Sequence, residues 1–151
     1  MQLTRFTDYS IRVLIHVASR RDDELSSIQE IADAYDISRN HLMKVVVDLG
    51  RAGFLETIRG RAGGLRLGRP ADTINLGELV RQTEQSLKLV DCSSCLIAPS
   101  CVLPRILAEA TRAFLAVLDR YTLADLLRDR SGDLRALFDA ALPAVPCSAS
   151  A

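Results

Sequence analysis

The chain of 151 residues is 48% hydrophobic but only 5% aromatic, which suits one small domain with appendages and favours helices packed on helices over a β-sandwich. The formal net charge is zero, yet residues 39–69 carry seven basic and two acidic side chains, a local charge of +5 that indicates an anionic partner, DNA foremost. The first residues lack a signal-peptide pattern and no apolar run approaches the roughly 20 residues of a membrane span, so we expect a cytoplasmic protein without a membrane partner.

Three helices are predicted in the first third of the chain. Residues 5–20 place apolar side chains around a largely buried helix. Ser27 and Glu30 have the spacing of a capping box that opens a second, short helix, and Asp36 ends it. Ser38 then caps a third helix that is polar and basic at its start. Two short helices joined by three or four residues in this way predict a helix-turn-helix.

The next segment predicts a β-hairpin with a basic tip. FLETIR alternates in polarity, GRAGG forms a turn and LRLGRP returns. Arg59 and Arg61 stand beside glycines that let the backbone approach a groove closely, and guanidinium groups suit phosphates and narrow minor grooves. A helix-turn-helix followed by a basic hairpin predicts a winged helix, and the repeated basic theme favours DNA contact over a solvated turn.

The rest of the chain is predicted to be helical around one loop. Asn75 caps a fourth helix, the cysteine segment forms a loop, and residues 102–122 form a long helix whose apolar stripe is wider than a small winged-helix core can cover. We therefore interpret it as a dimer helix. Thr122 and Asp125 open a short helix. The predicted fold is mainly α, a winged helix-turn-helix with a β-hairpin wing plus a long C-terminal dimerisation helix. Its divisions are the DNA-binding domain (1–74), a connecting helix with the cysteine loop (75–101), the dimerisation helix with a short helix (102–130), and a weak helix with a flexible tail (131–151).

Three of the four cysteines lie close together as Cys92-x2-Cys95-x5-Cys101. Disulfides are rare in the cytosol, and C-x2-C is shared by zinc and iron–sulfur sites. A zinc site usually shows a second pair of ligands at short spacing, so its absence favours an iron–sulfur cluster and leaves a structural zinc loop as the alternative. Neither histidine follows the cluster of thiols. The fourth ligand would come from a distant carboxylate, from the tail that carries Cys147, or from a partner chain.

Four separated motifs carry a family resemblance: RFTDYSIRVLIHVAS, SRNHLMKVV, LGRAGFLETIRGRAGGLRLGRPA and YTLADL. From Met1 to about Arg128 the chain resembles the NsrR-like nitric-oxide-sensing repressors of the Rrf-type (NsrR/IscR/RirA) winged-helix regulators. The resemblance implies a homodimer formed through the long helix and a cluster of the [4Fe–4S] type. Its ligands would be three thiolates and a carboxylate of the other subunit, here Cys92, Cys95, Cys101 and Asp8 of the partner subunit. The two residues between the first two cysteines are fewer than the family's usual four or five. Without the resemblance, Asp8 is better explained as a first-turn residue that faces the helix macrodipole.

The resemblance also places the helix that begins at Ser38 in the major groove and the wing in the minor groove. The implied DNA-binding residues are Ser38, Arg39, Asn40, His41, Lys44, Arg59 and Arg61. His16 is interpreted instead as a packed helix residue.

The resulting hypothesis is a dimer that represses from a palindromic operator and is released by nitric oxide. Reaction at the cluster would free Asp8, tilt the winged-helix domain and change the spacing of the two recognition helices, about 34–36 Å for successive DNA turns. An iron or redox sensor of the same family is one alternative. A small iron–sulfur redox protein is another, which the basic wing disfavours. No paired carboxylates or nucleophile–base motif indicates an enzyme.

Overall fold

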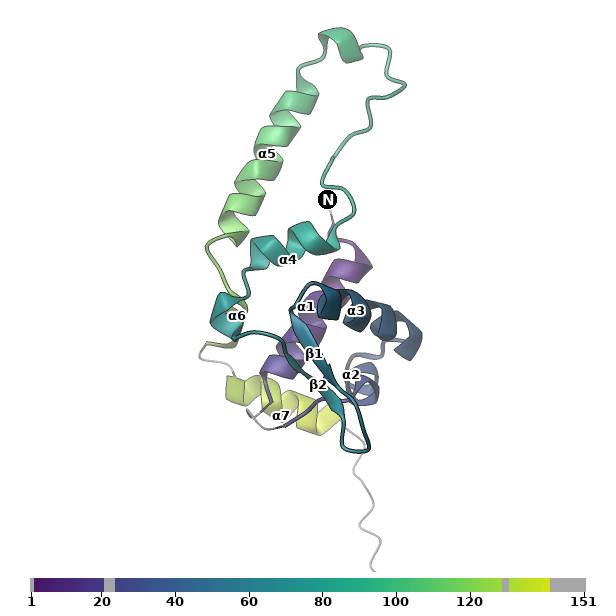
Figure 1. Cartoon of the computed structure of the whole chain (residues 1–151). Helices are drawn as coiled ribbons and strands as arrows, with labels where there is room; N and C mark the ends of the chain where they lie inside the picture. The colour runs from purple at the N-terminus through teal and green to yellow at the C-terminus, as the bar shows by residue number, and fades with distance from the viewer. Residues whose placement is uncertain (1, 21–23, 129–130, 142–151) are drawn as a thin grey trace, which may run out of the picture.

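The computed structural model describes residues 2–20, 24–128 and 131–141, and it places a winged-helix domain at the base of a projecting arm (Figure 1). The arm consists of α5 and the long segment before it. Within the described residues, no helix is long and apolar enough to cross a membrane. In chain order the elements are α1 (Arg5–Ala18), α2 (Ile28–Tyr35), α3 (Arg39–Arg51), β1 (Leu55–Ile58), β2 (Gly64–Leu67), η1 (Ala71–Thr73), α4 (Leu76–Thr83), η2 (Ala98–Ser100), α5 (Leu103–Leu118), α6 (Leu123–Leu127) and α7 (Ser131–Ala141).

The helix-turn-helix is set by its caps, as the sequence predicts. The Glu30 amide donates to the Ser27 hydroxyl at 3.1 Å, and the Ser27 amide donates to the Glu30 carboxylate at 2.7 Å, which completes the capping box. Asp36 ends α2 in the left-handed region with φ 52°. The Ser38 hydroxyl then accepts from the His41 amide at 3.3 Å and starts α3.

The wing is a two-stranded antiparallel hairpin in which Leu55 pairs with Leu67 and Ile58 with Gly64. A single antiparallel bridge between Ser26 and Leu65 joins the segment before α2 to the edge of β2. Two positions at the tip require glycine. Gly60 has φ +120°, which other residues rarely adopt, and a side chain at Gly63 would collide with the backbone carbonyl of Ile58. The predicted basic hairpin is therefore confirmed in the structure.

The hydrophobic core belongs to the winged-helix domain and is centred on α1. It collects side chains from α1, α2, α3, the wing and α4, and α6 contributes Leu123, which is fully buried. The main buried members are Val13, Leu14, Val17, Ile31, Leu42, Val45, Val46, Leu49, Phe54, Leu55, Leu65, Ile74, Leu79 and Leu123. None of the buried core residues comes from α5.

The C-terminal end of α5 is tied to the domain although its body is not. Arg81 on α4 donates two hydrogen bonds to the Asp119 carboxylate, at 2.6 and 2.7 Å. The Asn75 side-chain amide donates to the backbone carbonyl of Asp119 at 2.8 Å. The long helix predicted for residues 102–122 thus ends at Leu118, because Thr122 already caps α6 through its capping box with Asp125.

The weak helix expected over LRALFDAAL is an ordered helix of 11 residues, α7, that packs on the winged-helix domain. Phe138 is buried and its ring centroid lies 4.6 Å from that of His16 and 5.6 Å from that of Tyr35. Arg135 donates to the Ser19 carbonyl at 2.9 Å. His16 is fully buried, in agreement with its interpretation as a packed helix residue. The flexible tail predicted after α7 lies outside the described residues.

Candidate nucleic-acid interface and cysteine loop

The outer side of α3 is open to solvent and carries the predicted major-groove residues. The helix buries Leu42, Val45, Val46 and Leu49 against the core. Its cap and its opposite side are exposed and bring together Ser38, Arg39, Asn40, His41 and Lys44. Arg59 and Arg61 are exposed as well, at the tip of the wing, which projects away from the helices (Figure 1). The predicted DNA residues therefore occupy two separate exposed places, one helix face and one hairpin tip.

The basic side chains differ in whether a carboxylate neutralises them. Arg66 on β2 pairs with Glu56 at 2.8 Å, and Arg51 at the end of α3 lies 3.6 Å from Asp48. Arg39, Lys44, Arg59 and Arg61 form no ion pair with any carboxylate of the described residues. Their charge remains available for phosphate groups.

The first turn of α1 touches the start of α3. The ring of Tyr9 lies 6.4 Å from that of His41, measured between centroids, in a tilted arrangement. Asp8 precedes Tyr9 in the same turn. This ring pair links the first turn of α1 to the exposed start of α3.

The cysteine loop is ordered by short turns and carries three free thiols. The Cys95 amide donates to the Cys92 carbonyl at 3.3 Å, and the Cys101 amide donates to the Ala98 carbonyl at 3.3 Å at the end of η2. Cys92 and Cys101 are half-buried and Cys95 is exposed. Leu96 beside them is 95% exposed. Ile97 and Val102 are exposed as well, so the loop carries several apolar side chains that a further partner could cover.

Thiols are the donor type that an iron–sulfur cluster requires, but the described residues of one chain do not bring enough donors together to hold it. Within the described residues, no three His, Cys, Asp or Glu side chains lie close enough together to hold a metal ion. Three free thiols on one short loop are nonetheless the donor type that such clusters require, and they supply three of four ligands. A cluster at this place would therefore need the three thiols to converge and a further residue to serve as the fourth ligand.

Asp8 lies in the first turn of α1, and its carboxylate is already engaged. Arg12, one turn along the helix, donates from Nε to Oδ1 at 3.0 Å, and its Nη2 lies 2.9 Å from Oδ2. This hydrogen bond with Asp8 is the main reason that the pKa of Arg12 is raised. The Asp8 side chain is 45% exposed, so it remains accessible to a second molecule.

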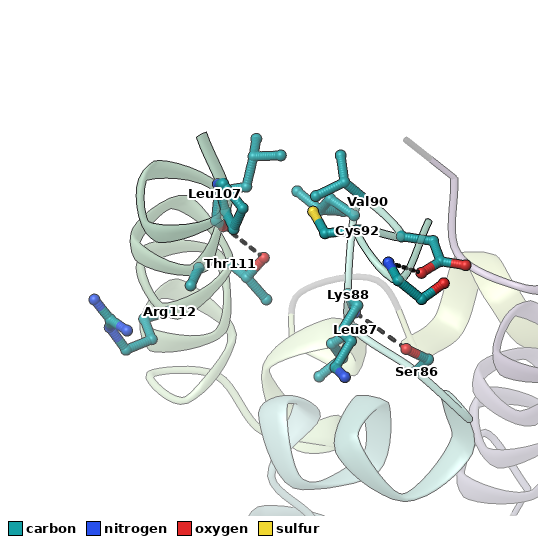
Figure 2. A pocket seen from close by; sticks show the side chains of 13 residues that line it. Ser86, Leu87, Lys88, Val90, Cys92, Leu107, Thr111 and Arg112 are labelled. Atoms are coloured by element: carbon teal, nitrogen blue, oxygen red, sulfur yellow. Dashed lines mark hydrogen bonds between the residues drawn. The ribbon is translucent and has the colours of Figure 1, made fainter. Parts of the chain in front are cut away.

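A groove of about 1120 Å³ separates the segment before the cysteines from α5. Figure 2 shows Leu107 and Thr111 on α5 facing Val90 and Cys92 across it. Cys92 thus forms part of the wall of an open, mainly apolar groove.

A cluster of hydrogen bonds that sequence reasoning did not find joins the base of the cysteine loop to α1. Glu84, directly after α4, accepts through one carboxylate oxygen from the Thr4 amide at 2.8 Å and from the Thr7 hydroxyl at 2.6 Å. The buried Thr7 hydroxyl oxygen also lies 2.9 Å from that of Thr83. A carboxylate at a helix N-terminus is favourable for the exposed amides and the macrodipole. Glu84 lies 80 residues from Thr4, so no local sequence pattern reveals the pairing.

The fold and these surfaces define a winged-helix transcriptional regulator that binds DNA, with an appended thiol-bearing loop. The model of the Rrf2 family, described as "Iron-dependent Transcriptional regulator", matches residues 3–129. The chain therefore belongs to the Rrf2 family, whose members are regulators rather than enzymes. This confirms the resemblance at the level of the family.

Curated relatives extend the similarity over almost the whole chain. The HTH-type transcriptional regulator NsrR of Bacillus subtilis is 51% identical over 142 residues, covering 91% of this chain and 97% of the relative. NsrR of Shouchella clausii is 48% identical over 142 residues, with 91% and 95% covered.

Solved structures agree on the fold. A structure described as T. potens IscR has a TM-score of 0.70 at 26% identity and covers 85% of this chain and 88% of its own. CymR, the global cysteine regulator of B. subtilis, has a TM-score of 0.64 at 28% identity, with 83% and 95% covered. The predicted mainly helical winged-helix fold is confirmed by these structures.

Proposed function

We propose that the chain is a cytoplasmic, iron–sulfur-dependent repressor that leaves its DNA operator in response to nitric oxide. The observation that carries the proposal is the chain of contacts between the three-thiol loop and the exposed start of α3. Glu84 joins the base of the three-thiol loop to the first turn of α1, and Tyr9 of that turn contacts His41 of the recognition helix. Similarity to regulators named NsrR supports this type of protein.

The DNA-binding part of the proposal assigns α3 to the major groove and the wing to the minor groove. Arg39, Asn40, His41 and Lys44 would contact base edges and phosphates after the turn capped by Ser38. Arg59 and Arg61 would approach the minor groove, because the glycine tip lets the backbone come close. The lack of carboxylate partners among the described residues supports these roles.

The assembly part of the proposal is a homodimer on a palindromic operator. The 16 residues of α5 include no buried side chain, while Leu103, Ile106 and Val117 are exposed apolar groups on it. A two-fold dimer through this helix would cover them. It would also set two copies of α3 about 34–36 Å apart, the spacing of successive DNA turns.

In the sensing part of the proposal, the protein's own residues hold the cofactor and orient its ligands. Cys92, Cys95 and Cys101 would hold a cluster of the [4Fe–4S] type, and Asp8 of the partner subunit would be the fourth ligand. When bound, the cluster supplies iron that nitric oxide can attack. Arg12 engages the Asp8 carboxylate through one hydrogen bond from Nε and an ion pair from Nη2. Asp8 therefore has a ready alternative partner within its own helix when it is not a ligand.

The test begins with anaerobically purified protein and a duplex selected from a random-sequence library by that protein. Iron and sulfide content and the visible absorption are measured, followed by duplex affinity before and after stoichiometric nitric oxide. We expect a brown protein whose affinity falls at least tenfold on exposure. A colourless protein with zinc would overturn the cluster, and a cluster protein whose affinity is indifferent to nitric oxide would overturn the signal.

Variants of the donors locate the ligands in the same experiment. Cys92→Ser, Cys95→Ser and Cys101→Ser should each abolish the absorption, and Asp8→Ala should shift it or make it labile. Cys147→Ser is the matched control, because it removes a thiol outside the loop, and it should change nothing. Loss of the absorption in Cys147→Ser with an unchanged Asp8→Ala would show that the tail, and not Asp8, supplies the fourth ligand.

A second candidate is an iron sensor of the same family, which the family description "Iron-dependent" favours. In that case iron chelation under anaerobic conditions should release the duplex as effectively as nitric oxide does. A small iron–sulfur redox protein, in contrast, would be reduced reversibly and would select no duplex sequence. The same preparation therefore separates all three functions.

A further inference from the structure

Two exposed apolar side chains of the winged-helix domain lie together on the recognition helix. Among the described residues from Thr4 to Val80, Met43 and Val47 are the only large hydrophobic side chains in the exposed class, at 47% and 50% exposure. Both belong to α3. Single exposed apolar residues need no explanation by themselves. Two of them one helical turn apart on the outer side of α3 indicate a specific contact.

The helix geometry places both side chains in the middle of the basic surface. Residues four apart lie above one another on a helix, so Val47 follows Met43 by one turn and Arg39 precedes it by one turn. Asn40 and Lys44 form the neighbouring row on the same open side. The buried residues of α3 lie on the opposite side. The apolar pair is thus framed by polar and cationic groups that suit nucleic acid.

The major groove offers one apolar feature to a helix, the C5-methyl group of thymine. We propose that Met43 and Val47 read thymine methyl groups and so determine part of the operator sequence. The inference rests on the proposed placement of α3 in the major groove. The side chains suit the task differently: Met43 is flexible and adapts its position, whereas Val47 is stiff at χ1 and fixes one contact.

The first arm of the test uses the wild-type protein, so it does not depend on the folding of any variant. The duplex is the one selected by the protein from a random library, and each thymidine is replaced in turn by deoxyuridine, which removes only the methyl group. Affinity is measured by fluorescence anisotropy. We expect one or two thymines in each half of the site to lose about fourfold on replacement, which corresponds to burial of one methyl group.

The second arm assigns each methyl group to a side chain. Met43→Ala and Val47→Ala should bind the thymine duplex more weakly and lose the response to deoxyuridine at one position each. Leu137→Ala is the matched control, because Leu137 is an exposed apolar residue on a different helix, α7. It should keep the full response at every position.

The outcomes separate this inference from the proposed function. If no duplex sequence is selected, both fail. If a sequence is selected but deoxyuridine has no effect at any position, only the reading of methyl groups is wrong. The inference is also overturned if Met43→Ala and Val47→Ala both retain the wild-type deoxyuridine response, since other groups would then contact the methyls.

Discussion

Helices α1 and α5 are similar in length and both are amphipathic, but only α1 has its apolar face buried within the chain. The 14 residues of α1 include six that are buried, among them Val13, Leu14 and Val17. The 16 residues of α5 include none. An apolar stripe predicts that a helix face will be buried, but it does not show whether the same chain or another chain buries it. In α1 the cover is the rest of the same domain, whereas in α5 the described residues of the chain cover the face only in part.

The arm, formed by α5 and the segment before it, is attached to the winged-helix domain at both ends, and its middle is exposed to solvent. The Arg81–Asp119 pair holds the end of α5 to α4, and Glu84 holds the start of the cysteine segment to α1. Between these two attachments lie the groove and the three thiols. The winged-helix domain is therefore complete within one chain, and we expect the arm to be completed by a second one.

The largest expected effect is on the free energy of unfolding, from a substitution in the core of the winged-helix domain. Leu14→Ala removes a fully buried side chain and should lower the free energy of unfolding by about 2–5 kcal/mol. Ile106→Ala, on α5 and 52% exposed, should change the free energy of unfolding of the monomer by less than about 0.5 kcal/mol. Urea titration with circular dichroism measures both. Equal losses would contradict the contrast between the two helices.

The next largest effect is expected on the dissociation constant of self-association through α5. Ile106→Glu places a charge on the apolar face of α5 and should weaken self-association on the order of 100-fold, because an unpaired charge is costly to bury. Sedimentation velocity over a range of concentrations measures the dissociation constant. Leu137→Glu introduces the same charge at an exposed apolar position on α7 and should leave the dissociation constant unchanged. A dimer that persists in Ile106→Glu would refute the assigned interface.

Acid should weaken the winged-helix domain through His16. Burial of the ring, with a smaller contribution from the positive charge of Arg20, lowers the pKa of His16 to about 4, and Glu30 opposes the shift. In the unfolded chain His16 becomes protonated near pH 6.5, whereas in the folded chain it stays neutral until the pH approaches 4. Stability is therefore fully present above pH 6.5 and falls as the pH drops towards 4, by about 2 kcal/mol between pH 7 and pH 5.

Chemical denaturation at pH 7 and pH 5 measures this dependence. His16→Phe keeps an aromatic ring beside Phe138 and removes the titrating group, so its stability should differ less between the two pH values than that of the wild type. An unchanged dependence would show that other groups cause it.

The smallest effect is expected at the wing. Arg59→Ala and Arg61→Ala each remove one unpaired cation and should reduce the slope of log affinity against log salt by about 0.9 for each lost phosphate contact. Arg66→Ala is the matched control, because Arg66 is already paired with Glu56 at 2.8 Å, and its slope should change less. Anisotropy titrations at several salt concentrations provide the slopes.

Much of the winged-helix fold could be predicted because its signals are local. Ser27 with Glu30, and Ser38 with the following turn, determine helix starts within four residues of sequence. The glycine tip of the wing is also a local requirement. The predicted DNA residues are exposed for the same reason, since the periodicity of α3 separates its core side from its open side.

The connections between elements could not be predicted in this way. The Glu84–Thr7 hydrogen bond joins residues 77 apart, and the packing of Phe138 on His16 joins two ends of the chain. Neither contact leaves a periodic pattern, because each depends on how helices meet in space. For this reason the sequence predicts only a weak helix where the structure has α7 packed on the winged-helix domain.

The sequence by itself determined the helices, the wing, the family motifs and the number of thiols in the loop, because these follow from capping, periodicity and residue type. Only the tertiary structure decided that the thiols of one chain do not converge, that Asp8 is held by Arg12, and that Met43 and Val47 stand alone on the open side of α3. The physical reason is that exposure and convergence are properties of packing. A side chain becomes buried or exposed only through neighbours that are distant in the sequence.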